Sequence, residues 1–255
     1  ALRCIWQSCR IRISDKYPCQ QPTSYPAITS LPNDGFVVVW HLAGQESYHG
    51  IYGQRYNSSS VAVGTEFHVN TYTSNYQVEA DITTLLDGSF VVTWTSKNQD
   101  GSNYGIYGQR FDADGFKLSD EFQINTETYS SQYTPNISSL EDGGFVVTWQ
   151  SAYQDGSDYG IYGQRYDQYG NTVGSEFSIN TETNDEQQFP SISSIADGGF
   201  VATWASYGQD GSEYGVYGQR FDASGAPAGS EFQVNTYTNS NQANPSITAL
   251  PDGGY

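Results

Sequence analysis

The residues of this chain best suited to chemistry are carboxylates that recur in glycine-rich turns. Asp100 and its counterparts head Asp-Gly-Ser loops, and Asp112 and its counterparts open Asp-x-x-Gly turns. Ca²⁺ takes six to eight oxygen ligands, so acidic loops from adjacent units could bind it. Aspartate before glycine is also ordinary hairpin chemistry, and no copy has the Asp-x-Asp-x-Asp-Gly spacing of a calcium loop. The calcium candidates are Asp100, Asp112, Asp114, Asp155, Asp167, Asp210 and Asp222; no other cofactor is predicted.

Arginine is the second recurring group, and it follows glutamine each time. The set is Arg55, Arg110, Arg165 and Arg220. A ligand-binding arginine is one interpretation. Structural pairing is the favoured one, either with a turn aspartate or with the recurrent glutamates Glu66, Glu121, Glu176 and Glu231, because a planar guanidinium binds carboxylates in a fixed geometry.

These groups belong to a tandem repeat. The Gln-Arg pairs stand 55 residues apart, and Glu-Phe and Asn-Thr pairs recur at the same step. Such a period indicates a supersecondary unit that cannot bury its apolar face alone. The sequence predicts repeats at 20–74, 75–129, 130–184 and 185–239, with 240–255 as the start of a truncated further repeat.

Each repeat holds four short runs of alternating apolar and polar residues, separated by Asp-Gly and Gly-Gly signals. In the third copy the runs are 136–140, 145–151, 159–166 and 175–180. This pattern predicts antiparallel strands joined by tight hairpins. Four meandering strands per repeat predict an all-β fold, a β-propeller-like array of four-stranded antiparallel blades, with a β-solenoid as the alternative. The blades should span about 26–71, 81–126, 136–181 and 191–236.

Aromatic and glycine positions indicate how the blades should pack. One slot of the second run holds Trp40, Trp94, Trp149 and Trp204. A sugar-binding aromatic box is possible there, but apolar neighbours on the same face favour a core ring buried between blades. The recurring Tyr-Gly-Ile-Tyr-Gly places glycine on one face of a strand, where a ring from the neighbouring blade is expected to lie on the backbone.

Charge excludes several classes of partner. The chain carries 28 acidic and 10 basic residues, for a formal net charge of −18. This charge repels nucleic acid and anionic membrane surfaces, and no apolar run is long enough for membrane insertion. An acidic surface of this kind is typical of an extracellular or cell-surface setting.

The first residues do not fit the repeat. Codons compatible with residues 1–17 read, in the next frame, as a segment that matches Gln219 to Thr236 at all but three places. We therefore interpret 1–19 as an out-of-frame remnant of a preceding blade. Cys4, Cys9 and Cys19 are all the cysteines of the chain, and on this interpretation they carry no disulfide, zinc or thiol chemistry.

The motifs Asp-Gly-Gly-Phe-Val-Val-Thr-Trp-Gln-Ser, Gln-Asp-Gly-Ser-x-Tyr-Gly-Ile-Tyr-Gly-Gln-Arg-Tyr-Asp and Gly-Ser-Glu-Phe-x-Ile-Asn-Thr run through 20–255. They resemble tandem repeats of very large secreted or surface bacterial proteins, often described as adhesin-like or as haemolysin-type calcium-binding proteins. The resemblance implies an extracellular bacterial array and transfers no catalytic residue. The chain lacks the glycine-aspartate nonapeptides that bind calcium in the haemolysin type.

The sequence thus predicts a non-enzymatic extracellular scaffold for adhesion or interaction within a larger exported protein. Its partners would be a surface glycan or protein and the neighbouring blades of the same longer chain. The alternative is a multivalent, lectin-like propeller with one carbohydrate site per blade. An enzyme is not expected, because near-identical copies offer no unique cleft of unlike catalytic groups.

Overall fold

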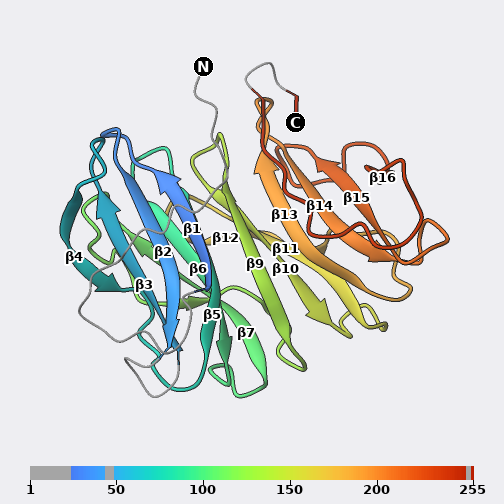
Figure 1. Cartoon of the computed structure of the whole chain (residues 1–255), viewed down its shortest axis with the longest axis horizontal. Coiled ribbons are helices and arrows are strands. Elements are labelled where there is room, and N and C mark those ends of the chain that lie inside the picture. The colour runs from blue at the N-terminus through green and yellow to red at the C-terminus, as the bar shows by residue number, and fades with distance from the viewer. Residues whose placement is uncertain (1–23, 44–48, 251–253) are drawn as a thin grey trace.

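The chain folds into four sheets of four antiparallel strands each (Figure 1). The computed structural model describes residues 24–43, 49–250 and 254–255. Every sheet is a meander in which consecutive strands pair. The predicted all-β array of four-stranded blades is confirmed. The predicted out-of-frame segment 1–19, with Cys4, Cys9 and Cys19, lies outside the described residues.

Each sheet is one blade, numbered in chain order. Blade 1 comprises β1 (Ser24–Ser30), β2 (Phe36–Ala43), β3 (His49–Tyr56) and β4 (Ala62–His68). Blade 2 comprises β5 (Gln77–Thr84), β6 (Phe90–Lys97), β7 (Tyr104–Phe111) and β8 (Phe122–Gln123). Blade 3 comprises β9 (Gln132–Ser139), β10 (Phe145–Ala152), β11 (Tyr159–Tyr166) and β12 (Thr172–Ser178). Blade 4 comprises β13 (Gln187–Ser194), β14 (Phe200–Tyr207), β15 (Tyr214–Phe221) and β16 (Phe232–Gln233).

The blades fan out around a common centre. The first strands β1, β5, β9 and β13 lie toward the middle of the molecule, and β4 and β16 lie at its two sides (Figure 1). β1 lies against β5, β5 against β9, and β9 against β13. The segment 244–250 continues this series, because Ile247 N and Ala249 N donate to the Ser191 and Ser193 hydroxyls of β13. Five successive first strands, or segments in their place, therefore surround one axis.

The hydrophobic core lies between blades, as the repeat predicts. Three clusters fill the three interfaces, and each joins residues of two consecutive blades. At the last interface Phe200 and Phe221 stack at 4.8 Å, and Phe177 of blade 3 tilts onto Phe221 at 5.8 Å. The predicted burial of the four tryptophans is confirmed, with exposed fractions of 4% for Trp40 and 0% for Trp94, Trp149 and Trp204.

The strand glycines do receive aromatic rings, but from their own blade. A Cβ at Gly108 would stand 2.9 Å from the Phe122 ring, and one at Gly218 would stand 2.9 Å from the Phe232 ring. Phe122 pairs with Gly108 across β7 and β8 of one sheet. The expectation of a ring from the neighbouring blade is wrong, because the phenylalanine paired with each glycine belongs to the fourth strand of the same blade. The same ring then meets the next blade, as Phe122 meets Tyr166 at 5.8 Å.

Candidate functional site at the axis

The inner strands carry an irregularity that aims side chains at the axis. β5, β9 and β13 each contain a register shift in their pairing with the second strand. At the shift Glu79, Thr134 and Phe189 have φ of 57°, 50° and 56°. A left-handed conformation is costly for any residue with a Cβ, above all for β-branched threonine, and such strain gathers at functional sites. The bulge therefore marks this ring of positions.

These positions line a pocket of about 380 Å³ on the propeller axis. The walls are Pro26, Ala27, Glu79, Ala80, Asp81, Thr134, Pro135, Asn136, Phe189, Pro190, Asn244 and Pro245. Every blade and the segment after blade 4 contribute two or three of them, from the start of the innermost strand. We call this space the axial pocket.

The axial pocket is where the repeats differ. Gln77 and Ile82 of blade 2 have counterparts in the later first strands, at 132 and 137 and at 187 and 192, and in the segment after blade 4, at 242 and 247. Between them the copies read Val-Glu-Ala-Asp, Tyr-Thr-Pro-Asn, Gln-Phe-Pro-Ser and Ala-Asn-Pro-Ser. Variation between fixed flanking residues is the sequence signal for this site, and the recurring residues alone do not reveal it.

Asp81 is held by hydrogen bonds on both oxygens. Its Oδ1 accepts from Ile82 N at 2.9 Å, and its Oδ2 accepts from Asn136 Nδ2 at 2.8 Å and Ile137 N at 2.9 Å. Burial raises the pKa of Asp81 to about 6, although the bonds from Ile137 and Ile82 act in the opposite direction. Asn136 accepts from Ile192 N in the same way, at 2.7 Å. Asp81 thus clasps the next first strand and keeps a proton more readily than an ordinary aspartate.

Glu79 is the more available carboxylate of the axial pocket. Its Oε2 accepts from Thr95 Oγ1 and Thr134 N, both at 3.0 Å. In the described part of the chain, nothing donates a hydrogen bond to its Oε1. Phe189 and the prolines add apolar surface opposite these polar atoms. The axial pocket therefore combines fixed acceptors with flat apolar walls.

The recurring Asn-Thr and Glu-Phe pairs stabilise the fold through hydrogen bonds within and between blades. Asn125 Oδ1 accepts from Ile106 N at 2.7 Å, and its Nδ2 donates to Glu127 O at 2.7 Å, which ties the end of the blade to its third strand. Thr126 donates through N and Oγ1 to Glu176 of the next blade, at 2.7 and 2.9 Å. Glu121 and Glu231 accept from the preceding blade in the same way. The threonine–glutamate hydrogen bonds thus join each blade to the next.

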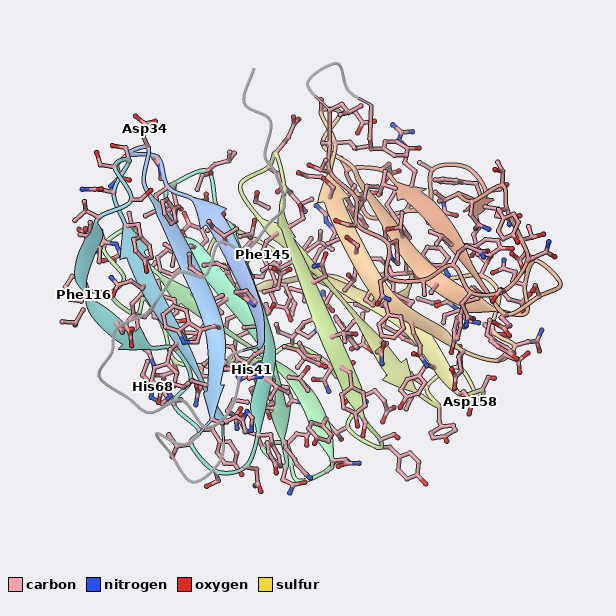
Figure 2. The ribbon with its side chains drawn as sticks, in the orientation of Figure 1. Asp34, His41, His68, Phe116, Phe145 and Asp158 are labelled. Atoms are coloured by element: carbon pink, nitrogen blue, oxygen red, sulfur yellow. The ribbon has the colours of Figure 1, made fainter. Side chains whose placement is uncertain are left out.

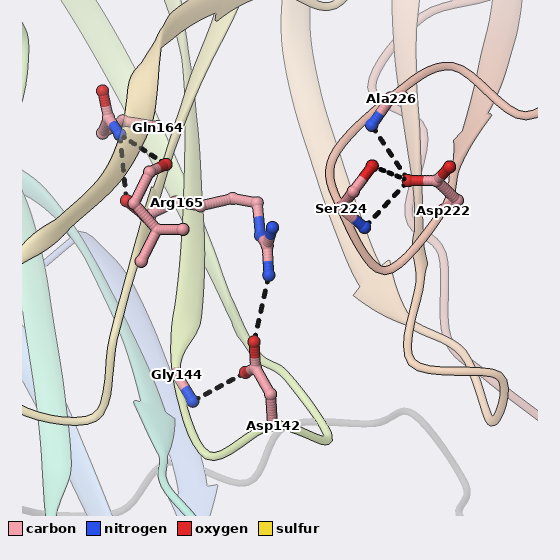
Figure 3. Close-up of polar contacts among 8 residues, drawn as sticks. Asp142, Gly144, Gln164, Arg165, Asp222, Ser224 and Ala226 are labelled. Carbon is pink, nitrogen blue, oxygen red and sulfur yellow. Dashed lines mark hydrogen bonds and ion pairs between the residues drawn. The ribbon is translucent and has the colours of Figure 1, made fainter.

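The repeated arginines bind turns, of the next blade in blades 1 and 2 and of their own blade in blades 3 and 4. Arg55 reaches Asp114 of blade 2 at 2.9 Å, whereas Arg165 pairs with Asp142 of its own blade at 3.0 Å (Figure 3). Arg220 pairs with Asp197, and Arg110 donates to Tyr169 O of blade 3 at 3.0 Å. Among the described residues no arginine pairs with the recurrent glutamates. That alternative is wrong, because threonines of the preceding blade already occupy Glu121, Glu176 and Glu231.

The calcium candidates do not gather into a common site in the described part of the chain. Asp222 Oδ1 accepts from Ser224 and Ala226 of its own turn, as Figure 3 shows, and Asp112 and Asp167 do the same in theirs. Asp100, Asp155 and Asp210 each accept from the serine two residues on. Asp114 pairs with Arg55. Within 24–43, 49–250 and 254–255, no group of three or more metal-ligating side chains forms. Calcium binding stays a prediction.

Solved structures show which fold this is. No family model matches the chain, and no curated protein does so. An α-L-arabinanase of Penicillium chrysogenum, solved with arabinobiose, matches 91% of this chain and 72% of its own at a TM-score of 0.63 and 16% identity. An α-L-arabinofuranosidase of Lactobacillus brevis matches 91% and 80% at 0.53 and 11%, and a Dyadobacter fermentans protein of unknown function matches 90% and 72% at 0.64 and 10%. At these identities the likeness is one of fold.

Two sequence-based conclusions need correction. The prediction of a non-enzymatic scaffold is wrong, because the solved proteins with this fold include an arabinanase and an arabinofuranosidase. The argument against an enzyme assumed that identical copies offer no cleft of unlike groups. The axial pocket is such a cleft, since the copies differ where they meet.

No helix in the described ranges is long and apolar enough to cross a membrane.

The chain is thus a β-propeller-like array of four-stranded blades, with an axial pocket lined by unlike residues.

Proposed function

We propose that the chain acts on carbohydrate and that the axial pocket is where it binds a short oligosaccharide. The observation that carries this is the ring of unlike residues at the axis, which holds Glu79, Asp81 and Asn136 beside Phe189 and prolines. Carboxylate and amide oxygens accept hydrogen bonds from sugar hydroxyls, and flat apolar walls cover the C–H faces of a sugar ring. A volume of about 380 Å³ suits a small ligand.

Glu79 is the principal polar contact in this proposal. Thr95 and Thr134 fix its Oε2 and leave Oε1 as an acceptor. A hydrogen bond to a charged acceptor contributes roughly twice as much as a neutral one. The arabinobiose bound by the Penicillium chrysogenum arabinanase makes pentose oligosaccharides the first ligands to try.

One axial site replaces the sequence-based alternative of one sugar site per blade. The tryptophans that recur in each blade, which were the candidates for such sites, are buried and have no face left for a ligand. Carbohydrate binding is retained from that alternative, whereas multivalency is not.

Glycoside hydrolysis is the second candidate, and Asp81 is the observation that favours it. Most glycosidases use two carboxyl groups, one of which stays protonated near neutral pH to act as general acid. The pKa of Asp81 is raised to about 6, and Glu79 stands two residues away on β5. The three hydrogen bonds to Asp81 weigh toward a holding role, so we place binding first.

Calorimetric titration with arabinobiose and other pentose and hexose disaccharides tests the binding proposal. We expect Glu79→Gln to weaken binding about tenfold, the loss of one charge-assisted hydrogen bond. Glu141→Gln, at an exposed turn of blade 3, is the matched control and should bind like the unchanged chain. Binding that Glu79→Gln leaves intact, or no binding at millimolar saccharide, contradicts the proposal.

Product release followed by NMR decides the second candidate. Hydrolysis by the pair requires that Glu79→Gln and Asp81→Asn each abolish turnover while both variants stay folded. Turnover that survives Asp81→Asn shows that Asp81 takes no part in the hydrolysis.

The extracellular or cell-surface location and the bacterial setting are further parts of the proposal, supported by the acidic composition and the repeat resemblance.

A further inference from the structure

One corner of the blade is built from the same three positions in blades 2, 3 and 4. It lies where the second strand ends and the third begins, at the end of the molecule marked by Asp158 and opposite Asp34 (Figure 2). In blade 2, Lys97 pairs with Tyr104, and its N donates to Tyr76 O. In blade 4, Tyr207 pairs with Tyr214, and its N donates to Glu186 O. Residues can therefore be compared position by position.

In blade 2 the corner holds an ammonium group of the chain itself. Lys97 Nζ lies 5.4 Å from the centroid of the Tyr76 ring and 5.3 Å from that of Tyr104. A cation within about 6 Å of a ring face is attracted by the electrons of the ring. The blade geometry at this corner thus places an alkylammonium between two tyrosines.

In blade 4 the described residues that line the corner are tyrosines and carboxylates, with no lysine or arginine among them. Tyr207 replaces the lysine, and its ring stands edge-on to Tyr214 at 5.1 Å. Asp158, Asp185 and Glu186 line the same pocket of about 190 Å³. None of the ion pairs in the described part of the chain involves these three carboxylates. We call this pocket the blade 4 corner.

Two hydrogen bonds hold the Glu186 carboxylate in place at the blade 4 corner. Tyr214 Oη donates a short hydrogen bond to Glu186 Oε2, and Gln188 Nε2 donates to the same atom at 2.8 Å. Burial, and then the hydrogen bond and charge of Glu186, raise the pKa of Tyr214 far above its ordinary value. The phenol therefore stays neutral, and the corner keeps an acidic side and an aromatic side.

We propose that the blade 4 corner binds an alkylammonium group, such as the ε-ammonium of a lysine side chain of a partner. Two aromatic rings supply the cation–π surface, and Glu186, Asp158 and Asp185 supply the opposite charge. Lys97 between Tyr76 and Tyr104 is the internal precedent. This site is separate from the axial pocket, although Glu186 and Phe189 stand three residues apart on one segment.

Blade 3 offers the matched comparison. Its corner has Ser131 and Ala152 at the positions of Glu186 and Tyr207 and keeps only Tyr159 of the aromatic pair. With no carboxylate and a single ring at those positions, it should not bind an ammonium ion.

Titration of the full chain with n-butylammonium chloride, followed by NMR of labelled tyrosines, tests the proposal. We expect saturable shifts of Tyr207 and Tyr214, with little change at Tyr169, which lies in the turn between β11 and β12. Butanol is the neutral control, and sodium chloride at equal ionic strength is the salt control. Tyr207→Ala should weaken binding at least about threefold, as expected for one exposed cation–π contact. Tyr207 is 42% exposed, so the variant should fold.

Tyr207→Lys is the decisive variant. It recreates the lysine of blade 2, and its own ammonium should occupy the corner and abolish binding of butylammonium. Tyr169→Ala, at an exposed tyrosine in the turn between β11 and β12 of blade 3, should bind as the unchanged chain does. Equal shifts with butanol or sodium chloride, or undiminished binding by Tyr207→Lys, overturn the proposal. Glu79→Gln should leave this titration unchanged, so the outcome is independent of the axial pocket.

Discussion

The repeats have the same residues where one blade packs on the next and different residues at the inner edges of the blades. Between blades, the same residues return in each copy, as with Trp94, Trp149 and Trp204, all fully buried. At the axial pocket the copies present Glu79, Thr134 and Phe189 at one equivalent position. Packing one blade on the next is the same task each time, so one solution serves throughout. The axis brings equivalent positions together, and there differences between copies add up to a site.

The left-handed conformation is the link between the two regions. It recurs at the same place in β5, β9 and β13 even though the residue changes from Glu79 to Thr134 to Phe189. The backbone there is thus fixed by the repeated scaffold, and the side chain is left to vary. A ligand pocket built this way has rigid walls of changeable chemistry.

The strongest test of this comparison replaces a large side chain in each region. Trp149→Ala removes a fully buried ring from the blade 2 and blade 3 interface, and we expect the free energy of unfolding to fall by about 3–5 kcal/mol. Phe189→Ala, at the partly exposed axial pocket, should cost far less and should impair saccharide binding. Urea unfolding and calorimetric titration measure the two effects. Similar destabilisation by both variants would erase the distinction.

How much the sequence could predict follows the same division. Hairpin signals and the 55-residue step predicted the sheets and the cores between them, because strand alternation and turn chemistry are local. Glu79 and Asp81 could not be singled out, since nothing local tells that position 79 of one repeat meets positions 134 and 189 of the next two. Their meeting depends on how the blades are arranged around the axis, and a search for recurring residues passes over positions that differ.

The partner of the repeated arginines was only half predictable for a similar reason. The sequence supplies one arginine, one glutamate and several aspartates per repeat, and spacing does not choose among them. In the structure Arg55 crosses to the next blade, whereas Arg165 stays within its own. Arg55 faces the turn Asp112-Ala113-Asp114 of the next blade and pairs with Asp114. Arg165 faces the turn Asp222-Ala223-Ser224, which has a serine in place of that aspartate.

A repeated polar residue should also matter more to folding than an exposed one of the same type. Asn125→Ala leaves the buried Ile106 N–H without its acceptor and Glu127 O without a donor. We expect a loss of about 2–3 kcal/mol in the free energy of unfolding. Asn171→Ala, whose Nδ2 bonds only to Asp167 at the surface, is the control and should cost less than about 1 kcal/mol. Guanidinium unfolding measures the stability of both variants. Equal losses would show that the two hydrogen bonds of Asn125 stabilise the fold no more than a surface hydrogen bond does.

The pH dependence of unfolding tests whether Asp81, a residue of the axial pocket, also affects the stability of the fold. Its pKa rises from about 4 in the unfolded chain to about 6 in the fold. The fold then binds more protons than the unfolded chain between these values, so this group lowers stability as pH rises from about 4 to 6, by at most about 3 kcal/mol. Because Asp81 lines an open pocket, we expect about 1–2 kcal/mol. Thermal or urea unfolding across that range, with Asp81→Asn as reference, measures it. Parallel pH profiles of the two proteins would contradict the shift.

The smallest effect separates backbone strain from packing at the blade interface. Gly170 and Gly174 both have positive φ, 87° and 73°, but a Cβ at Gly170 would stand 3.1 Å from Arg110 Cδ, whereas one at Gly174 would meet nothing within 4 Å. Both alanine variants should lose about 1 kcal/mol to the left-handed backbone. Gly170→Ala should lose about 1 kcal/mol more by displacing Arg110. In an Arg110→Ala background that excess should vanish, as a double-mutant cycle would measure. If the excess persists there, it belongs to the turn itself, and Gly170 is not kept in the repeat by the arginine of the preceding blade.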